Sequence, residues 1–306
     1  MLTRIVVGLL LLPLLLIPFF APDWAMAAAV SVISAVSVWE LLHNTGFSPK
    51  KRLTAYAVVF AALVPLWLYL NMPYNLPVSY FWSYIADHSA LPTIWDYIGG
   101  FRLWPYQSGQ AVWFLVILIF VLILFAEGVA DHEKVRFKNI AIIFTAAFII
   151  PCCFSSLIYL GKYFILLPLI AALFNDICAY FTGVKFGKHK LTPVSPKKTV
   201  EGSIGGLVGV AVGMFVYGTI LQTGFDLTVN FPLLLLYGLI GGVAGQLGDL
   251  SMSLIKREAG IKDFGKILPG HGGMLDRFDS VLFAAPVILG LMMLWPAIEP
   301  PLPSWL

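Results

Sequence analysis

The stretch AVWFLVILIFVLILFAE, residues 111–127, decides the fold class. It carries no charged side chain before Glu127, and its length falls within the roughly 17–25 residues that a transmembrane helix needs. The rest of the chain has the same character, because 59% of the 306 residues are apolar, only 11% are charged and the mean hydropathy is +0.89. Soluble domains carry about 25% charged residues. The sequence therefore predicts an integral membrane protein.

Apolar runs of similar length recur along the chain. They predict an all-α, polytopic membrane protein with about nine transmembrane helices. These nine spans cover residues 5–21, 25–42, 54–71, 111–127, 139–160, 163–183, 203–222, 231–254 and 280–297. The first run, preceded by Arg4 and followed by Ala25-Met26-Ala27, also resembles a cleavable signal peptide. Its direct continuation into a second apolar run favours retention.

The distribution of basic residues predicts the orientation of the chain. If the N-terminus is cytoplasmic, all of the 19 Lys and Arg residues except Arg102 and Lys162 fall on the cytoplasmic side. This asymmetry is the positive-inside bias, and with nine spans it places the C-terminus outside. The segment at about 72–110 is rich in Trp and Tyr, which favour the headgroup layer. We therefore expect a long, interfacial outer loop there.

Polar residues divide the chain into two regions. We predict an N-terminal transmembrane scaffold, residues 1–140, and a C-terminal catalytic region, residues 141–306, with cytoplasmic loops at 184–202 and 255–279. In the scaffold, Glu40 and His43 lie near a helix end, where we expect the solvent around the loop to hydrate them.

The C-terminal region places ionisable groups inside apolar helices. Asp176 interrupts one span, at a cost of at least about 2.5 kcal/mol on insertion scales, so it indicates a functional site unless a nearby lysine neutralises it. In GDLSMSLIKR, residues 248–257, the spacing of Asp249, Ser253 and Lys256 puts all three on one helix face.

The connection that follows, KDFGKILPGHGGMLDRFDS at residues 262–280, is rich in glycine and charge. Its glycines prevent a regular helix, and Asp276 and Asp279 share a face at the start of the last span. Carboxylates beside cations indicate a metal–phosphate site, because Mg²⁺ takes one or two protein carboxylates and completes its shell with water and phosphate oxygens. The P-loop and dinucleotide-binding patterns are absent from the sequence.

Residues 253–279, SLIKREAGIKDFGKILPGHGGMLDRFD, resemble the signature of the phosphatidate cytidylyltransferase family, also called CDP-diacylglycerol synthases. That signature reads S-x-x-K-R, then K-D, then H-G-G-x-x-D-R-x-D. NDICAYFTGVKFGK at residues 175–188 and SPKKTVEG at residues 195–202 extend the resemblance upstream. The resemblance implies transfer of CMP from CTP to phosphatidate, which gives CDP-diacylglycerol and pyrophosphate in phospholipid biosynthesis.

The resemblance also implies roles for individual residues. Asp249, Asp276 and Asp279 would hold Mg²⁺, and a second cation is left open. The other predicted catalytic residues are Lys256, Arg257, His271 and Arg277, which would contact phosphate or the leaving group. The predicted substrate-binding residues are Asp176, Ser195, Lys197, Lys198, Ser253, Lys262, Gly272 and Gly273.

We expect CTP, phosphatidate and membrane lipid as partners, and no nucleic acid. The family resemblance suggests a homodimer. We expect a bacterial inner membrane, with the active site on the cytoplasmic side, where the distribution of basic residues places the charged loops. Two alternatives remain. A CTP-dependent enzyme acting on another lipid fits because the motif does not contain acceptor selectivity. An ion-coupled transporter would use Asp176 and Asp249 as coupling sites, but these aspartates lie near the cytoplasmic rim with lysines and not at the midplane.

Overall fold

The computed structural model describes residues 22–71, 108–267 and 272–299. Within these ranges, eight helices are long and apolar enough to cross a membrane, in agreement with the all-α polytopic fold. They are α2 (Asp23–Asn44), α3 (Lys51–Leu70), α6 (Ser108–Ala130), α7 (Phe137–Phe164), α8 (Leu166–Phe186), α9 (Val200–Gly224), α10 (Phe231–Glu258) and α11 (Leu275–Leu294). The predicted span 5–21, most of the predicted outer loop and His271 lie outside the described residues.

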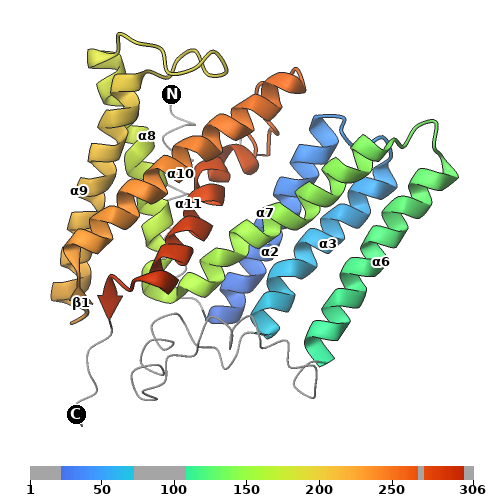
Figure 1. Ribbon diagram of the computed structural model, residues 1–306, viewed down its shortest axis with the longest axis horizontal. Coiled ribbons are helices and arrows are strands. Elements are labelled where there is room, and N and C mark those ends of the chain that lie inside the picture. Colours follow the sequence, from blue (N-terminus) through green and yellow to red (C-terminus); the bar gives the residue numbers. More distant parts are fainter. Residues whose placement is uncertain (1–21, 72–107, 268–271, 300–306) are drawn as a thin grey trace.

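Successive helices alternate in direction, so that the connections at 45–50, 131–136 and 187–199 gather at one end of the bundle (Figure 1, top). The end of α10 and the beginning of α11 lie at the same end. At the opposite end, the short strands β1 (Thr228–Val229) and β2 (Ile298–Glu299) pair antiparallel. The basic loops of the sequence thus share one end of the fold, and the side of the membrane that this end faces stays a prediction.

Helix α7 connects the two predicted regions, because it packs against α2 and α3 on one side and against α11 on the other. The C-terminal helices approach one another closely at glycines. A Cβ atom at Gly206 of α9 would lie 2.9 Å from the main-chain oxygen of Asn175 in α8, and one at Gly248 of α10 would lie 2.6 Å from that of Asp279 in α11. Small residues permit such close approach between membrane helices. Here they bring together the stretches of backbone that carry Asp249 and Asp279.

The helices extend further into both predicted cytoplasmic loops than the sequence indicated. The connection between α8 and α9 covers 187–199 instead of 184–202, and that between α10 and α11 covers 259–274 instead of 255–279. Hydropathy ends a span at the first charges, whereas backbone hydrogen bonding continues beyond the hydrocarbon. The Thr199 side chain, for example, accepts from Gly202 N and caps α9. Asp276 and Asp279 consequently lie within the first turns of α11.

Candidate active site

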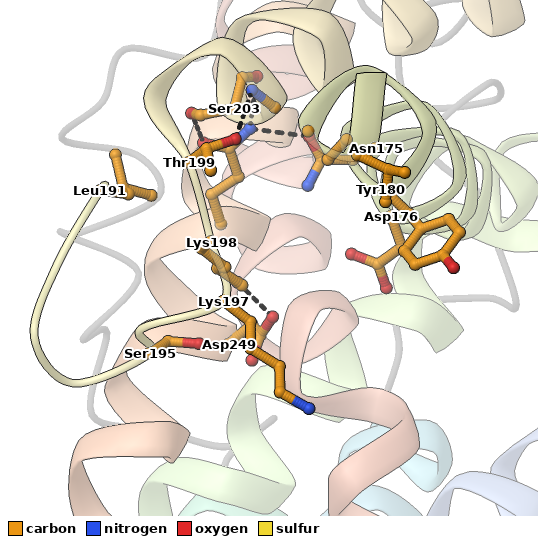
Figure 2. A pocket seen from close by; sticks show the side chains of 15 residues that line it. Asn175, Asp176, Tyr180, Leu191, Ser195, Lys197, Lys198, Thr199, Ser203 and Asp249 are labelled. Carbon is orange, nitrogen blue, oxygen red and sulfur yellow. Dashed lines mark hydrogen bonds and ion pairs between the residues drawn. The ribbon is translucent and has the colours of Figure 1, made fainter. Parts of the chain in front are cut away.

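A cavity of about 520 Å³ lies between α8, α9, α10 and the 187–199 connection. Figure 2 shows the side chains that line it, with Asp176 on α8 and Asp249 on α10 facing the same space. Five predicted site residues belong to this lining, namely Asp176, Ser195, Lys197, Lys198 and Asp249. Residues from three helices and one connection therefore meet at the end of the fold where the basic loops gather.

An ion pair joins two side chains of the cavity lining. The Lys198 ammonium, from the 187–199 connection, donates to Asp249 Oδ2, and the two side chains are 30% and 24% exposed. Ser253, one helical turn beyond Asp249, donates to its Oδ1 over 3.4 Å. The charges of Asp176 and Asp249 also act on one another. Two carboxylates that share a site repel each other unless a cation lies nearby, so this wall can accommodate positive charge.

Amide groups join the three helices at the same cavity. Gln246 Nε2 donates to Asn175 Oδ1 over 2.8 Å and to the Ser203 main-chain oxygen over 3.0 Å. The Ser203 hydroxyl donates in turn to Gln246 Oε1. The network is partly buried, and hydrogen bonds of this kind help to fix the relative positions of the elements they join. Asn175 begins the stretch 175–188 that carries part of the family resemblance, whereas the sequence-based predictions missed Gln246 and Ser203, whose only signal is their polarity within apolar, glycine-rich spans.

A second lysine–aspartate pair is more deeply buried. Lys256 Nζ in the last turn of α10 donates to Asp276 Oδ1 over 2.8 Å, and the side chains are 10% and 3% exposed. Asp276 Oδ2 accepts from Phe264 N over 2.8 Å and from Gly273 N over 3.0 Å. The Lys256 ammonium also lies 5.2 Å from the centre of the Phe264 ring. Through Phe264 and Gly273, the Lys256–Asp276 pair holds two points of the α10–α11 connection near the end of α10.

Asp279 interacts electrostatically with a member of each of the two lysine–aspartate pairs. Its side chain is buried and accepts from Ser280 N over 2.7 Å, and the charges of Asp249, Lys256 and Asp176 all act on it. In the part of the chain that the structure describes, no three His, Cys, Asp or Glu side chains are arranged to hold a metal ion by themselves. Mg²⁺ needs only one or two protein carboxylates when a triphosphate supplies further oxygens, so the donor set fits that ion.

Other predicted site residues lie at the edge of this arrangement. Lys262, Arg257 and Arg277 are exposed. Arg257 Nη1 donates to the Ile261 oxygen over 3.4 Å, and the charge of Arg277 acts on Asp176. The two predicted glycines lead into α11: Gly272 has φ +86°, a conformation that favours glycine, and Gly273 is buried. The structure thus brings the arginines to the rim and leaves Lys262 in solvent.

The expectation that Glu40 is hydrated at a helix end is wrong. Its side chain is fully buried, and its carboxylate accepts from Met274 N over 3.0 Å and from Leu275 N over 2.9 Å, at the start of α11. His43 is exposed and stacks on Trp39. Glu40 is the one charged residue in the predicted span 25–42, and this could have indicated a buried role. Its position near a helix end instead favoured hydration by the solvent around the loop.

Known proteins resemble this chain over most of its length. Residues 2–295 match the model of the cytidylyltransferase family. A phosphatidate cytidylyltransferase of Bacillus subtilis is 41% identical over 187 residues, which cover 59% of this chain and 68% of the relative. One from Staphylococcus epidermidis is 39% identical over 203 residues, covering 60% and 72%. The Escherichia coli "Uncharacterized protein YnbB" is 46% identical over 114 residues, covering 37% of each chain.

The fold and the site define a membrane enzyme that handles phosphate groups at one end of a helical bundle. The match across residues 2–295 and the similarity to the Bacillus and Staphylococcus proteins show that the chain belongs to the cytidylyltransferase family. It is a nucleotidyltransferase of phospholipid biosynthesis.

Proposed function

We propose that the chain catalyses the transfer of CMP from CTP to phosphatidate, giving CDP-diacylglycerol and pyrophosphate. The observation that carries this proposal is the convergence of Asp176, Asp249 and Lys198 on one cavity beside the buried Lys256–Asp276 pair. Carboxylates and ammonium groups together suit a metal-bound triphosphate. The acceptor lipid follows from the relatives, several of which are named phosphatidate cytidylyltransferase.

The reaction is a substitution at phosphorus. A phosphate oxygen of phosphatidate forms a bond to the α-phosphorus of CTP, and the bond from that phosphorus to the oxygen bridging the β-phosphate breaks, so that pyrophosphate leaves. A phosphate monoester with a second pKa of about 6 is largely dianionic at pH 7, and its attack needs no strong general base. Positioning and charge neutralisation therefore supply most of the catalysis.

The side chains divide these tasks. Ser195, Lys197 and Lys198 bind the triphosphate from the 187–199 connection, where Lys197 is exposed and Lys198 lies against Asp249. Asp249, Asp276 and Asp279 would hold Mg²⁺, which when bound neutralises and orients phosphate oxygens. Lys256, Arg257 and Arg277 offset phosphate charge around the same centre, and the Ser253 hydroxyl can donate a hydrogen bond there. The roles predicted for Lys262, which is exposed, and for His271, which lies outside the described residues, stay predictions from the motif.

The lipid reaches the site from the side of the bundle. Tyr180 and Val184 line the cavity and are also 66% and 73% exposed on the flank of α8. A phosphate head can therefore enter the polar cavity while its acyl chains stay against apolar helix surface in the bilayer. In this proposal the site faces the cytoplasm, where CTP is found, because the basic loops lie at that end. Mg²⁺ as the particular metal and a homodimer belong to the same proposal.

The test is pyrophosphate release from CTP by purified protein, with and without phosphatidate and Mg²⁺, alongside Asp279→Ala. We expect release that requires both lipid and metal and that the substitution abolishes, because Asp279 is surrounded by the charged groups of the site. Release with another phosphorylated lipid, but not with phosphatidate, would exclude the proposed acceptor. No release with any lipid, on protein that melts cooperatively, would exclude cytidylyl transfer.

A further inference from the structure

The first turn of α11, which carries Asp276 and is followed by Asp279 in the second turn, has no cap of its own. The residue before the helix, Met274, is in a helical backbone conformation, and its side chain makes no capping hydrogen bond. The first N–H groups of a helix lack partners within the helix, and buried ones need an acceptor from elsewhere. That acceptor comes from α2, more than 230 residues earlier in the chain.

Glu40 of α2 supplies both of its carboxylate oxygens to this turn. Oε1 accepts from Met274 N over 3.0 Å, and Oε2 accepts from Leu275 N over 2.9 Å. Negative charge at a helix N-terminus is favoured by the helix dipole as well as by these hydrogen bonds. A side chain from the predicted scaffold therefore caps the helix that bears two of the predicted metal ligands.

The connecting backbone closes tightly around the same carboxylate. A Cβ atom at Gly273 would lie 2.5 Å from both Glu40 carboxylate oxygens, and one at Gly265 would overlap with Oε1. Glycine at these two positions lets the chain approach Glu40 from two sides. The position of the connection is consequently defined by the Glu40 side chain and not only by the ends of α10 and α11.

A second side chain of α2 acts on the same segment. Asn44, one helical turn beyond Glu40, donates through Nδ2 to the main-chain oxygen of Phe264. The N–H group of Phe264 donates to Asp276 Oδ2 over 2.8 Å. The contacts of α2 thus continue, through the single residue Phe264, to the carboxylate that pairs with Lys256.

The burial of Glu40 is costly. Its side chain has no exposed surface, and in the described parts of the chain it takes part in none of the ion pairs. A buried carboxylate that lacks a cation must be stabilised by hydrogen bonds and local dipoles, and here these come from the first turn of α11. Ionisable residues at such positions indicate a functional role.

We infer that Glu40 is a positioning residue, which holds the first turn of α11 so that Asp276 and Asp279 keep their places against Lys256 and Asp249. The effect on catalysis rests on the proposed function, whereas the effect on the turn does not. Glu40 accepts hydrogen bonds from Met274 N and Leu275 N, and neither of these residues lines the cavity. Its removal should therefore lower kcat and raise the Mg²⁺ concentration needed, with little change in the KM for phosphatidate.

The experiment compares Glu40→Gln with Glu127→Gln, a matched substitution at a carboxylate of α6 that lies in ion pairs away from the connection. A glutamine at position 40 accepts one N–H group but presents its own NH₂ to the other. We expect kcat to fall roughly 10- to 100-fold, as displacements of about 1 Å can cause. Hydrogen exchange at the Met274 and Leu275 amides should quicken in Glu40→Gln alone.

Wild-type kcat and Mg²⁺ dependence in folded Glu40→Gln would overturn the inference, and so would unchanged exchange at the two amides. If Glu40→Gln cannot be purified, Gly265→Ala tests the same contact from the other side and should show the same faster exchange and higher Mg²⁺ requirement; wild-type behaviour in that variant would overturn it too. If the unmodified enzyme transfers nothing to phosphatidate, the proposed function fails, and hydrogen exchange still decides whether Glu40 holds the turn.

Discussion

Two clusters of lysine–carboxylate pairs lie at the same end of the fold. They differ in charge balance, and the second contains one pair, Lys256–Asp276, that is buried more deeply than any pair of the first. The rim cluster consists of Lys50, Arg52, Glu127 and Asp131. In it, Lys50 Nζ lies 3.0 Å from Glu127 and 3.1 Å from Asp131, and Arg52 Nη1 lies 3.7 Å from Glu127. The site cluster consists of Asp176, Lys198, Asp249, Lys256, Asp276 and Asp279.

Under the proposed function, this difference would separate a structural role from a chemical one. The rim cluster has two bases and two acids, and it joins the start of α3 to the end of α6. The site cluster sets four carboxylates against two lysines, with the exposed Arg277 acting on Asp176. Unbalanced negative charge in a partly buried site is expensive unless a cation joins it. The rim cluster is thus complete in itself, whereas the site cluster is suited to a metal-bound substrate.

The largest expected effect of this difference is on activity. Asp249→Asn keeps the shape of the side chain but removes the charge that pairs with Lys198 and faces the cavity. We expect pyrophosphate release to fall on the order of 10²- to 10³-fold, the size typical of a lost electrostatic contact in a transition state. Steady-state rates at saturating CTP and Mg²⁺ measure this fall.

Asp131→Asn in the rim cluster is the matched control, since it removes the same charge from a carboxylate that also pairs with a lysine. Its rate should remain close to that of the unmodified enzyme. Equal losses in the two variants would contradict the division between the clusters.

The next effect concerns stability. Lys256→Met leaves the buried Asp276 carboxylate without its cation, and breaking a buried ion pair from one side costs about 3–5 kcal/mol. Unfolding in mixed detergent micelles should show a loss of that size. Lys50→Met should cost less, because Glu127 and Asp131 are 15% and 28% exposed instead of 3%, and Arg52 still lies near Glu127 after the change. A shift for Lys50→Met as large as that for Lys256→Met would show that burial does not distinguish the clusters.

The sequence predicted the helices well because their signal is local. Eight of the predicted spans correspond to α2, α3 and α6 to α11, since an apolar run of that length suits a membrane helix and little else. The shared face of Asp249, Ser253 and Lys256 was equally predictable, because the three residues lie on one helix and their spacing defines that face. In both cases the information lies within a few turns of the chain.

Relations between distant segments could not be predicted in this way. Nothing near Glu40 in the sequence indicates that the start of α11 lies against it, more than 230 residues later. The Lys198–Asp249 pair and the Asn175–Gln246 contact likewise depend on how α8, α9 and α10 cross. Glycines make those crossings possible. A glycine in the sequence indicates that another segment can approach closely, but it does not indicate which segment that is.

The smallest expected effect is the pH dependence of the rim cluster. The hydrogen bond from Lys50 lowers the pKa of Asp131 below its ordinary value. A carboxyl group with a lowered pKa in the folded state adds stability above its unfolded pKa of about 3.9, and that contribution is lost as the pH falls through the folded value. The melting temperature of the unmodified protein should therefore exceed that of Asp131→Asn slightly at neutral pH, and the gap should close on acidification below about pH 4. A gap that persists or widens in acid would show that Asp131 does not stabilise the fold through its charge. In that case the joining of α3 to α6 would depend on apolar contacts such as Phe60 against Phe120, whose ring centres are 4.2 Å apart.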